Sequence, residues 1–431
     1  MNVVVLGLWH LGCVTAACLA AAGKRVVGLD DDAEVVARLE EGQPPIQEPG
    51  LAELIASGRA AERLSFTTDP AVLAEADVLW ITFDTPVDAS DVADVASVRR
   101  RIEGVRGAVR PGTLILVSSQ VPVGFTGALA RDWASLGVTF AYSPENLRLG
   151  KALAAFREPE RVIVGLTHAS DRARVEELFR PYGQRIEWMS VESAEMTKHA
   201  INAFLATSVT FINELARLCE RVGADAREVE RGLKTEGRIG PRAYLSPGPA
   251  FAGGTLARDL RFLAGFGQDL GVATSLMAGV LASNEAHRSW LRDKIGQLLA
   301  GVAQPVVAVL GLTYKPGTDT LRRSSSVELC GWLRERGVRV QAHDPAVRSL
   351  PPELQDAMVL CDDPRRALAG AALAVVATEW PDYRSLVAGD FAEGMRLPRV
   401  VDQSWFLREA LAHDPRIHYF APGRAEKKAN E

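Results

Sequence analysis

The chain has few cysteines and no recognisable pattern of metal ligands. Its 431 residues include only five cysteines, an odd number spread over the whole length, which argues against a disulfide scaffold. Neither a Cys-x-x-Cys nor a His-x-x-x-His spacing occurs, so we expect no structural zinc and no other metal site.

A strong excess of one charge is also missing. Lys and Arg number 49 and Asp and Glu 54, which gives a net charge of −5 without a basic block. This balance argues against nucleic acid as the main partner, whereas a small anionic ligand needs only a few placed charges. With 47% hydrophobic and 24% charged residues, the composition is typical of a soluble globular protein and excludes disorder.

Only residues 3–23 are apolar enough to suggest a membrane segment. The stretch contains His10 and Thr15, has no basic flank before it and leads directly into Lys24. A buried strand followed by a buried helix explains it better than a spanning helix or a signal peptide. We therefore expect a cytoplasmic protein without a membrane partner.

Alternating strand and helix patterns organise the first 190 residues. Short apolar runs predict buried strands, and the helical stretches between them imply parallel pairing in a doubly wound α/β sheet. The predicted strands are residues 3–6, 25–29, 78–83, 114–118, 139–142 and 161–165. A helix of small residues is expected over 13–22.

The middle of the chain predicts mainly helix. Residues 192–223 contain no proline and one terminal glycine, and their apolar or small residues recur at steps of three and four. This pattern indicates one long helix of roughly 45 Å. Shorter helices are expected over 226–233 and 256–263.

The last third repeats the pattern of the first. Gly311 and Asp344 end two successive predicted strands, as Gly7 and Asp30 do near the start, so we infer a second βαβ unit. The predicted elements are strands 306–310, 338–343, 373–377 and 400–402 and a helix over 326–336.

These patterns together predict two doubly wound Rossmann-like domains joined by a central helical domain with one long helix. We place the domains at residues 1–190, 191–300 and 301–431, and we expect the polar tail 424–431 to fray.

The turn after the first strand is similar to a dinucleotide-binding motif. Residues 7–12 read GLWHLG, and the pattern GxGxxG uses its first glycine, here Gly7, for the tight turn and its third, Gly12, for helix packing. Trp9 replaces the glycine that lets backbone approach pyrophosphate. Asp30 ends the next strand, where an acid holds a ribose hydroxyl and favours NAD over NADP. An ordinary βαβ turn is the alternative.

Further motifs follow in order along the chain. They are residues 45–51 (PIQEPGL), 84–86 (DTP), 120–124 (QVPVG), 142–147 (YSPENL), 195–198 (EMTK), 202–206 (NAFLA), 211–214 (FINE), 253–259 (GGTLARD), 311–316 (GLTYKP) and 378–380 (TEW). With this series in register over about residues 2–410, the chain resembles the UDP-glucose/GDP-mannose dehydrogenase family.

The resemblance implies a fold and a reaction. Family members have an NAD-binding domain, a central helical domain that dimerises through its long helix, and a C-terminal domain that helps to hold the nucleotide sugar. They oxidise the sugar's C6 alcohol to a carboxylate with two NAD, and a cysteine traps the intermediate aldehyde. We therefore expect an NAD-dependent homodimer in sugar-nucleotide or polysaccharide biosynthesis.

The resemblance also assigns catalytic roles. Lys198 and Asn202 match the catalytic lysine and the substrate asparagine, and their i, i+4 spacing places both on one helix face. The lysine would stabilise a developing alkoxide, and Asp259 matches an acid used in proton transfer. Glu145 matches the glutamate of a Ser-Pro-Glu motif, and Thr255 takes the place of the nucleophile. Taken singly, Lys198 and Asp259 could be surface helix residues and Glu145 a loop charge.

Two larger sets complete the implied site. The cofactor set comprises Gly7, Trp9, Gly12, Asp30, Thr85, Pro86, Gln120 and Arg322. The substrate set comprises Glu145, Leu149, Lys198, Asn202, Arg238, Tyr244, Phe251 and Lys315.

The departures from the family concern the second oxidation. Thr255 stands at the cysteine position, and no cysteine lies between Cys219 and Cys330. A thiol has a pKa of about 8.5, and a threonine hydroxyl is far less acidic and needs a strong adjacent base. Gln120 replaces a threonine that holds a water, and Leu149 replaces a second glutamate.

Three functions follow from this set of residues. We favour an oxidoreductase that stops after two electrons, releasing a carbonyl product or returning the hydride as an epimerase does. The alternatives are a four-electron dehydrogenase that works through an aldehyde hydrate, and a catalytically silent nucleotide-sugar-binding homologue.

Overall fold

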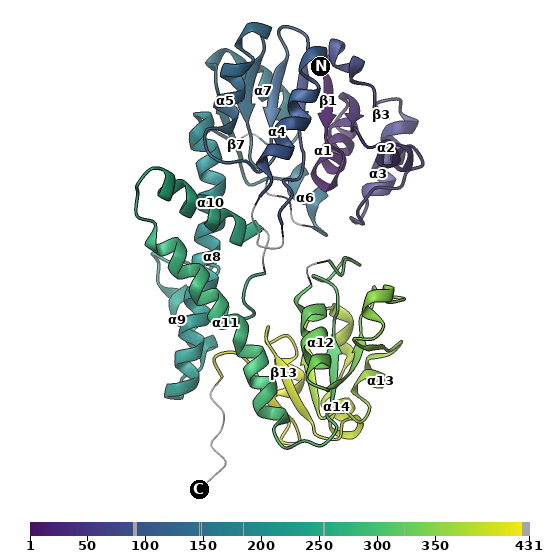
Figure 1. The fold of residues 1–431 in the computed structure, drawn as a ribbon, viewed down its shortest axis with the longest axis vertical. Helices are drawn as coiled ribbons and strands as arrows, with labels where there is room; N and C mark the ends of the chain where they lie inside the picture. Colours follow the sequence, from purple (N-terminus) through teal and green to yellow (C-terminus); the bar gives the residue numbers. More distant parts are fainter. Residues whose placement is uncertain are drawn as a thin grey trace. The chain divides into compact units, whose positions relative to one another are not determined.

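The chain divides into two compact units, Met1–Ile201 and Asn202–Glu431, and each is described by itself. The computed structural model describes residues 1–88, 93–145, 147, 149–183, 185–252, 255–322 and 324–424 (Figure 1). The predicted α/β class with two Rossmann-like sheets and a helical region is confirmed. The three-domain division stays a prediction.

An eight-stranded sheet forms the core of the first unit, in the order β3-β2-β1-β4-β5-β6-β7-β8. The apolar runs of β4 and β5 are buried at every position, as expected for strands covered on both faces. The strands are β1 (Asn2–Leu6), β2 (Arg25–Leu29), β3 (Leu64–Thr67), β4 (Val78–Ile81), β5 (Leu114–Val117), β6 (Thr139–Tyr142), β7 (Val162–Leu166) and β8 (Ile186–Met189).

The prediction of purely parallel pairing is wrong at β7. This strand runs antiparallel to β6, with Tyr142 opposite Gly165. An apolar run reports burial but not direction, and direction depends on how the connection returns to the sheet. The sequence pattern also missed β3 and β8. In β3 buried residues alternate with more exposed ones, and every residue of β8 is only partly buried.

Helix α1 packs deep inside the first unit because its side chains are small. Nine of its 12 residues are buried, among them three alanines. The helices of this unit are α1 (His10–Ala21), α2 (Ala33–Glu40), α3 (Leu51–Ala60), α4 (Val95–Gly104), α5 (Phe125–Asp132), α6 (Ala152–Arg157) and α7 (Arg172–Phe179).

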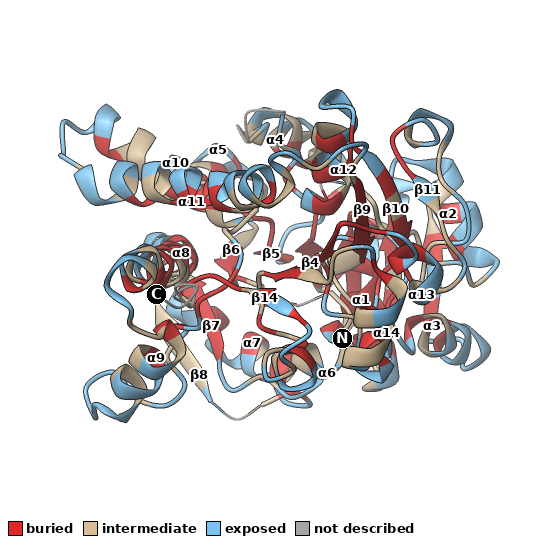
Figure 2. Ribbon diagram, turned by 90° about the horizontal axis from the view of Figure 1, so that it is seen from below, coloured by how far each residue is buried: buried red, intermediate tan, exposed pale blue. Residues whose placement is uncertain are grey.

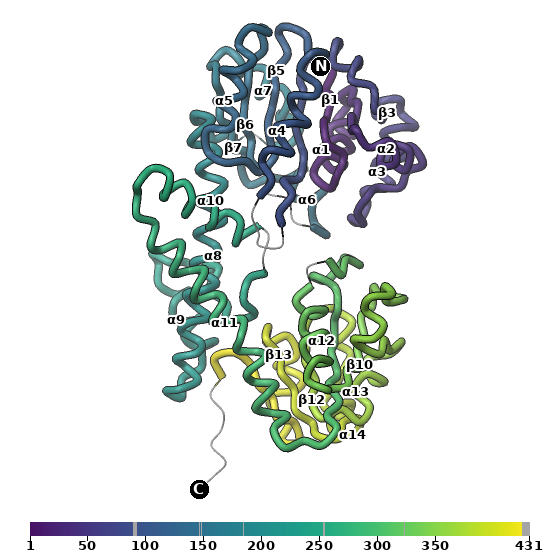
Figure 3. The backbone as a smooth tube through the Cα atoms, in the orientation of Figure 1, coloured from purple at the N-terminus to yellow at the C-terminus, as the bar shows by residue number. Residues whose placement is uncertain are grey.

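The long helix α8 (Val191–Val222) has 32 residues, which confirms the expectation for 192–223 (Figure 3). The second unit continues with α9 (Ala226–Thr235), α10 (Thr255–Asp269) and α11 (Ser275–Leu299). The sequence pattern missed α11. Its buried positions include Asn284 and His287, which interrupt the apolar stripe that marks a helix.

A six-stranded parallel sheet completes the second unit, and its strands β9 and β10 are largely buried in Figure 2. Its order, β11-β10-β9-β12-β13-β14, repeats that of the first six strands of the other sheet, as the inferred second βαβ unit requires. The strands are β9 (Val306–Leu310), β10 (Arg339–His343), β11 (Val359–Leu360), β12 (Leu373–Val376), β13 (Arg399–Asp402) and β14 (His418–Phe420).

Four short helices accompany this sheet among the described residues. They are α12 (Ser325–Glu335), α13 (Pro364–Leu368), α14 (Ala388–Gly394) and α15 (Arg408–Leu411). Of the tail expected to fray, residues 425–431 lie outside the described part of the chain.

The close approach of Gly12 on α1 to the backbone of Gly7 predicts the effect of a substitution on stability. A Cβ on Gly12 would lie 1.8 Å from the carbonyl oxygen of Gly7, so Gly12→Ala must push α1 away from β1. We expect a loss of about 2 kcal/mol, which lowers the midpoint of thermal unfolding by roughly 4–8 °C. Gly104→Ala in α4, where the Cβ meets open space, is the matched control. Equal midpoints for the two variants would contradict the contact.

Candidate active site

The first and third glycines of the GLWHLG turn have the geometry that their roles require. Gly7 has φ +101°, and a Cβ on it would lie 2.5 Å from the ring of Phe83. Gly12 sits directly against the carbonyl of Gly7. Helix α1 begins at His10, and its N-cap residue Trp9 makes no side-chain cap. The first N–H groups of a helix have no intrahelical partner and favour an anion, so the turn fits a pyrophosphate.

Trp9 does not fill this turn. Its backbone is extended, with φ −88° and ψ −158°, a conformation that any residue adopts. Its surface is 42% exposed. Trp9 therefore adds an indole side chain where the motif has a glycine without one. The backbone of the turn does not need a glycine at this position, because its conformation is open to any residue.

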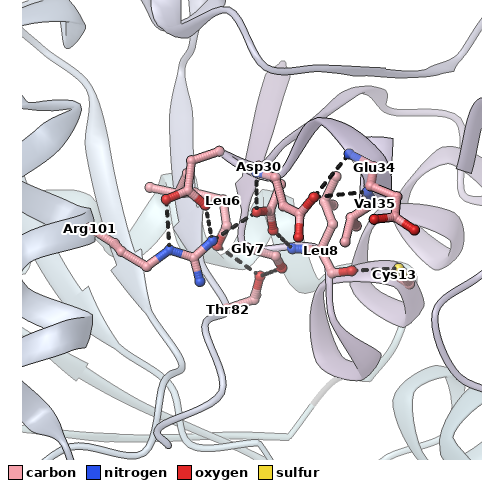
Figure 4. A network of polar contacts seen from close by, with 11 residues as sticks. Leu6, Gly7, Leu8, Cys13, Asp30, Glu34, Val35, Thr82 and Arg101 are labelled. Atoms are coloured by element: carbon pink, nitrogen blue, oxygen red, sulfur yellow. Dashed lines mark hydrogen bonds and ion pairs between the residues drawn. The ribbon is translucent and has the colours of Figure 1, made fainter. Parts of the chain in front are cut away.

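Asp30 lies at the end of β2 and holds the turn (Figure 4). Its Oδ2 accepts a hydrogen bond from the Leu8 N–H at 2.6 Å, and its Oδ1 accepts from the Asp32 N–H at 3.1 Å. The guanidinium of Arg101 also donates to Oδ1, at 2.8 Å. Burial raises the pKa of Asp30, and the hydrogen bond from Leu8 opposes that rise.

Arg101 on α4 was not predicted as a site residue. Its guanidinium lies 3.9 Å from the centroid of the Phe83 ring and donates to both Asp30 and Asp31. No sequence signal marks it clearly, because three consecutive arginines on a helix are typical of a solvated face. In the structure it balances the charge of the predicted ribose-binding acid.

Two residues of the predicted cofactor set contact each other. The hydroxyl of Thr85 donates to the carbonyl oxygen of Gln120 at 2.6 Å, and both residues are buried. Pro86 follows directly. Thr82 on the neighbouring strand end donates to the carbonyl of Gly7 at 2.8 Å, which joins this segment to the glycine turn. Arg322, the remaining cofactor candidate, is exposed in the second unit.

The first turns of α8 are fixed to the first turn of α5 and to the loop before it. Glu195 is fully buried and accepts hydrogen bonds from the N–H groups of Gly124 at 2.6 Å and Thr126 at 2.9 Å. His199 contacts the carbonyl of Val121 at 2.9 Å. Burial raises the pKa of Glu195, while its backbone partners oppose the rise. Glu195 belongs to a motif in the sequence, but its anchoring role was not predicted.

Lys198 lies one turn further along this anchored helix. Only 6% of its side chain is exposed, so its interpretation as a solvated surface lysine is wrong. Its ammonium donates to the backbone carbonyl of Glu145 and lies 3.4 Å from the Glu145 Oε1. The other carboxylate oxygen of Glu145 accepts from the Leu147 N–H at 2.7 Å. The structure thus brings the predicted lysine and glutamate together.

Asn202 and Asp259 form a second buried pair, in the second unit. Asp259 on α10 is fully buried, so its interpretation as a surface acid is wrong. The amide of Asn202 donates to its Oδ2. Thr255 is the first residue of α10, is exposed, and lies four residues before Asp259 on the same helix. Gly253 and Gly254 lie outside the described residues.

The remaining predicted substrate residues have varied surroundings. Arg238 is largely exposed and pairs with Glu236 at 2.9 Å. Tyr244 is exposed, whereas Phe251 packs against the buried residues between α8, α10 and α11. Leu149 and Lys315 are partly buried.

Every cysteine of the chain lies among the described residues, and none is prepared as a nucleophile. Burial raises the pKa of Cys18 to about 11 and that of Cys330 to about 12. It also raises the pKa of Cys13, Cys219 and Cys361. Because the thiolate is the reactive form, these thiols are poor nucleophiles at neutral pH.

The described part of the chain shows neither a cluster of metal ligands nor a helix suited to a membrane. Among those residues, no three His, Cys, Asp or Glu side chains gather as a metal site would require. The described helices also include none with both the length and the apolar character needed to cross a bilayer.

Comparison with known proteins identifies the family. Family models match residues 1–183, 192–286 and 308–409, described as the NAD binding, central and UDP binding domains of the UDP-glucose/GDP-mannose dehydrogenase family. The chain is 35% identical to UDP-glucose 6-dehydrogenase of Pseudomonas aeruginosa, with 93% of each chain covered. The chain belongs to the UDP-glucose/GDP-mannose dehydrogenase family. It is an NAD-dependent nucleotide-sugar dehydrogenase, an oxidoreductase acting on a CH–OH group.

Solved structures agree with this assignment. A UDP-glucose dehydrogenase from the archaeon Pyrobaculum islandicum is 32% identical and superimposes with a TM-score of 0.86 over 98% of both chains. A UDP-D-ManNAc dehydrogenase from Pyrococcus horikoshii, 25% identical, gives a TM-score of 0.87 over 99% of this chain and 100% of that one. The glycine turn at residues 7–12 and Asp30 lie within residues 1–183, which match the NAD binding domain of the family.

The contacts of Asp30 predict its effect on cofactor affinity. Asp30→Asn removes a charged acceptor from the Leu8 N–H and from the predicted ribose site, so we expect the Kd for NAD to rise about 10- to 100-fold. The preference for NAD over NADP should fall as well. Isothermal titration calorimetry measures both.

Asp344→Asn is the matched control for this variant. Asp344 accepts from the Leu312 N–H at 2.7 Å in the second sheet, so its loss should destabilise a loop and leave NAD affinity within about twofold. Equal NAD affinities for the two variants would contradict the assignment of Asp30.

Proposed function

We propose that this dehydrogenase oxidises an alcohol of a UDP-sugar by two electrons and releases a carbonyl product. The single observation that carries the proposal is Thr255, where the resemblance implies a nucleophilic cysteine, in a chain whose five thiols all have raised pKa values. The UDP binding domain of the family, at residues 308–409, supports UDP as the nucleotide.

The residues of the chain would share the first oxidation as follows. Lys198 is a buried cation, and it would stabilise the alkoxide that forms as the hydroxyl proton leaves, before the hydride of the C–H bond passes to NAD. Asn202, one turn along α8, would bind the sugar hydroxyl, and Asp259 holds its amide in place. Asp259 would take the hydroxyl proton. NAD, bound at the α1 turn, supplies the hydride acceptor.

The second oxidation would lack its thiol nucleophile in this chain. Thr255 is exposed at the start of α10, and its hydroxyl has a far higher pKa than a thiol. A threonine acts as an acyl acceptor only beside a strong base. The aldehyde would therefore leave without forming an acyl-enzyme.

A second candidate function follows from the relatives. UDP-glucose 6-dehydrogenases of Pseudomonas aeruginosa and Rhizobium meliloti are 35% and 32% identical to this chain over nearly their whole length. A four-electron reaction would need a base that activates water for an aldehyde hydrate, and the partly buried carboxylate of Glu145 beside Lys198 is a candidate. The hydride count separates the two functions.

The proposal predicts the stoichiometry of the reaction. With UDP-glucose, UDP-N-acetylmannosamine and GDP-mannose as a panel, we expect one NADH per sugar oxidised and an aldehyde or ketone that hydroxylamine traps. Absorbance at the NADH band and mass spectrometry of the trapped sugar measure both. Two NADH per sugar with a carboxylate product would establish the four-electron reaction instead.

Restoring the thiol should restore the second step. In Thr255→Cys the new thiol stands at a helix N-terminus, which lowers its pKa, so we expect up to two NADH per sugar and a covalent acyl-enzyme. Iodoacetamide should abolish only this added step. Thr255→Ser, which has a hydroxyl again, is the matched control and should stay at one NADH. A Cys variant without any acyl adduct would show that another feature limits the reaction.

We also propose that the protein forms a homodimer through α8. Phe204, Phe211 and Leu218 are exposed at seven-residue spacing on this helix, and Val222 continues the same stripe. An exposed apolar stripe of this length is typical of a protein interface. A cytoplasmic location is proposed as well, since all five cysteines are free thiols.

A paired charge variant tests the dimer. Phe211→Asp combined with Leu218→Asp places two carboxylates on the stripe, and we expect the mass in sedimentation equilibrium to fall from dimer to monomer. Val387→Asp, an equally exposed apolar residue outside α8, is the control and should leave the mass unchanged. A wild-type monomer, or a dimer that survives both substitutions, would contradict this interface.

A further inference from the structure

A buried carboxylate connects the start of α1 to the loop that follows β6. The Oε2 of Glu48 lies 2.9 Å from the His10 Nε2 and accepts from the Gly150 N–H at 2.7 Å. Its Oε1 accepts from the Ala152 N–H at 2.8 Å. Three segments that are far apart in sequence therefore meet at one side chain.

The burial of Glu48 makes each of these contacts necessary. Only 1% of its side chain is exposed, and a buried charge is costly unless hydrogen bonds compensate it. An ionised carboxylate only accepts hydrogen bonds, so the Nε2 of His10 must carry the proton and donate it. Charge-assisted hydrogen bonds of this kind are among the stronger polar contacts in proteins.

The loop that Glu48 holds leads into α6 without a side-chain cap from its own N-cap residue. Lys151, the N-cap residue of α6, makes no side-chain cap, so Glu48 provides this function from another segment. Gly150 adopts a left-handed conformation with φ +82°. The N–H groups of Gly150 and Ala152 both donate to Glu48, which lies in another segment.

A cavity next to the same loop reduces its packing. It has a volume of about 80 Å³ and is lined by Leu11 of α1, by Glu145 and Leu147, and by Phe156 of α6 among others. Apolar contacts therefore hold this loop less firmly than a filled core would. The polar contacts of Glu48 carry more of the positioning.

We propose that His10 and Glu48 are positioning residues for nucleotide-sugar binding, although His10 lies within the NAD-binding turn. We call the contacts of Glu48 with His10, Gly150 and Ala152 the tether. It connects the first turn of α1 to the loop with Glu145 and Leu149. The backbone carbonyl of Glu145 in this loop accepts a hydrogen bond from Lys198. The inference rests on the proposed function, in which this loop contacts the sugar.

The test separates sugar affinity from NAD affinity in the full-length protein. For His10→Ala we expect a five- to tenfold higher Kd for UDP-glucose by calorimetry, with the Kd for NAD changed less than twofold. Amide exchange at Gly150 and Ala152 should accelerate about tenfold, as for the loss of one charged hydrogen bond. Glu48→Gln should show the same pattern. His10→Gln keeps a donor and should recover most of the sugar affinity.

His168→Ala, an exposed histidine of the same unit, is the control and should resemble the wild type in every measurement. A His10→Ala variant that weakens NAD alone, or that leaves amide exchange at Gly150 and Ala152 unchanged, would overturn the tether. A wild-type protein that binds neither NAD nor UDP-glucose would refute the proposed function instead, and the exchange data would still decide whether the tether exists.

Discussion

Buried carboxylates that accept backbone N–H groups hold the loops of both units in place. Asp30 and Asp344 hold the glycine turns, Glu48 holds the loop before α6, and Glu195 holds the segment before α5. Asp402 does the same for the segment that leads to α15. Because an uncompensated buried charge is strongly unfavourable, each carboxylate permits only the loop conformation that supplies its donors. The positions of the candidate site residues depend on this constraint.

The two sheets show how one backbone plan serves two binding domains. Gly7 and Gly311 have nearly the same left-handed conformation, with φ +101° and +99°, and a buried aspartate follows one strand later in each sheet. The surroundings differ in character. Asp30 pairs with Arg101, whereas Asp344 also accepts from the indole of Trp380 at 3.0 Å. The shared strand order and the buried aspartate account for the same turn in both sheets. The side chains around each aspartate differ, and we expect them to set the ligand preference of each turn.

Helix α8 holds two of the predicted catalytic residues, Lys198 and Asn202. Glu195 and His199 fix its beginning, and Lys198 and Asn202 each enter a buried polar contact one turn apart. The groups suited to hydride transfer are therefore buried and hydrogen-bonded. The position that would form an acyl-enzyme is an exposed threonine hydroxyl. That contrast supports the proposed oxidation by two electrons.

The sequence by itself determined the repeated βαβ pattern and the long helix, because each leaves a local pattern of spacing. It predicted Lys198, Asn202 and Asp259 only through the ordered motifs that resemble the family. The direction of β7, the helix α11 and the roles of Glu48, Glu195 and Arg101 were decided by tertiary structure. A strand's apolar run does not encode its direction, and a buried polar residue hides a helical stripe. The carboxylate of Glu48 reaches the N–H groups of Gly150 and Ala152 only in the folded chain, so no local spacing in the sequence predicts this contact.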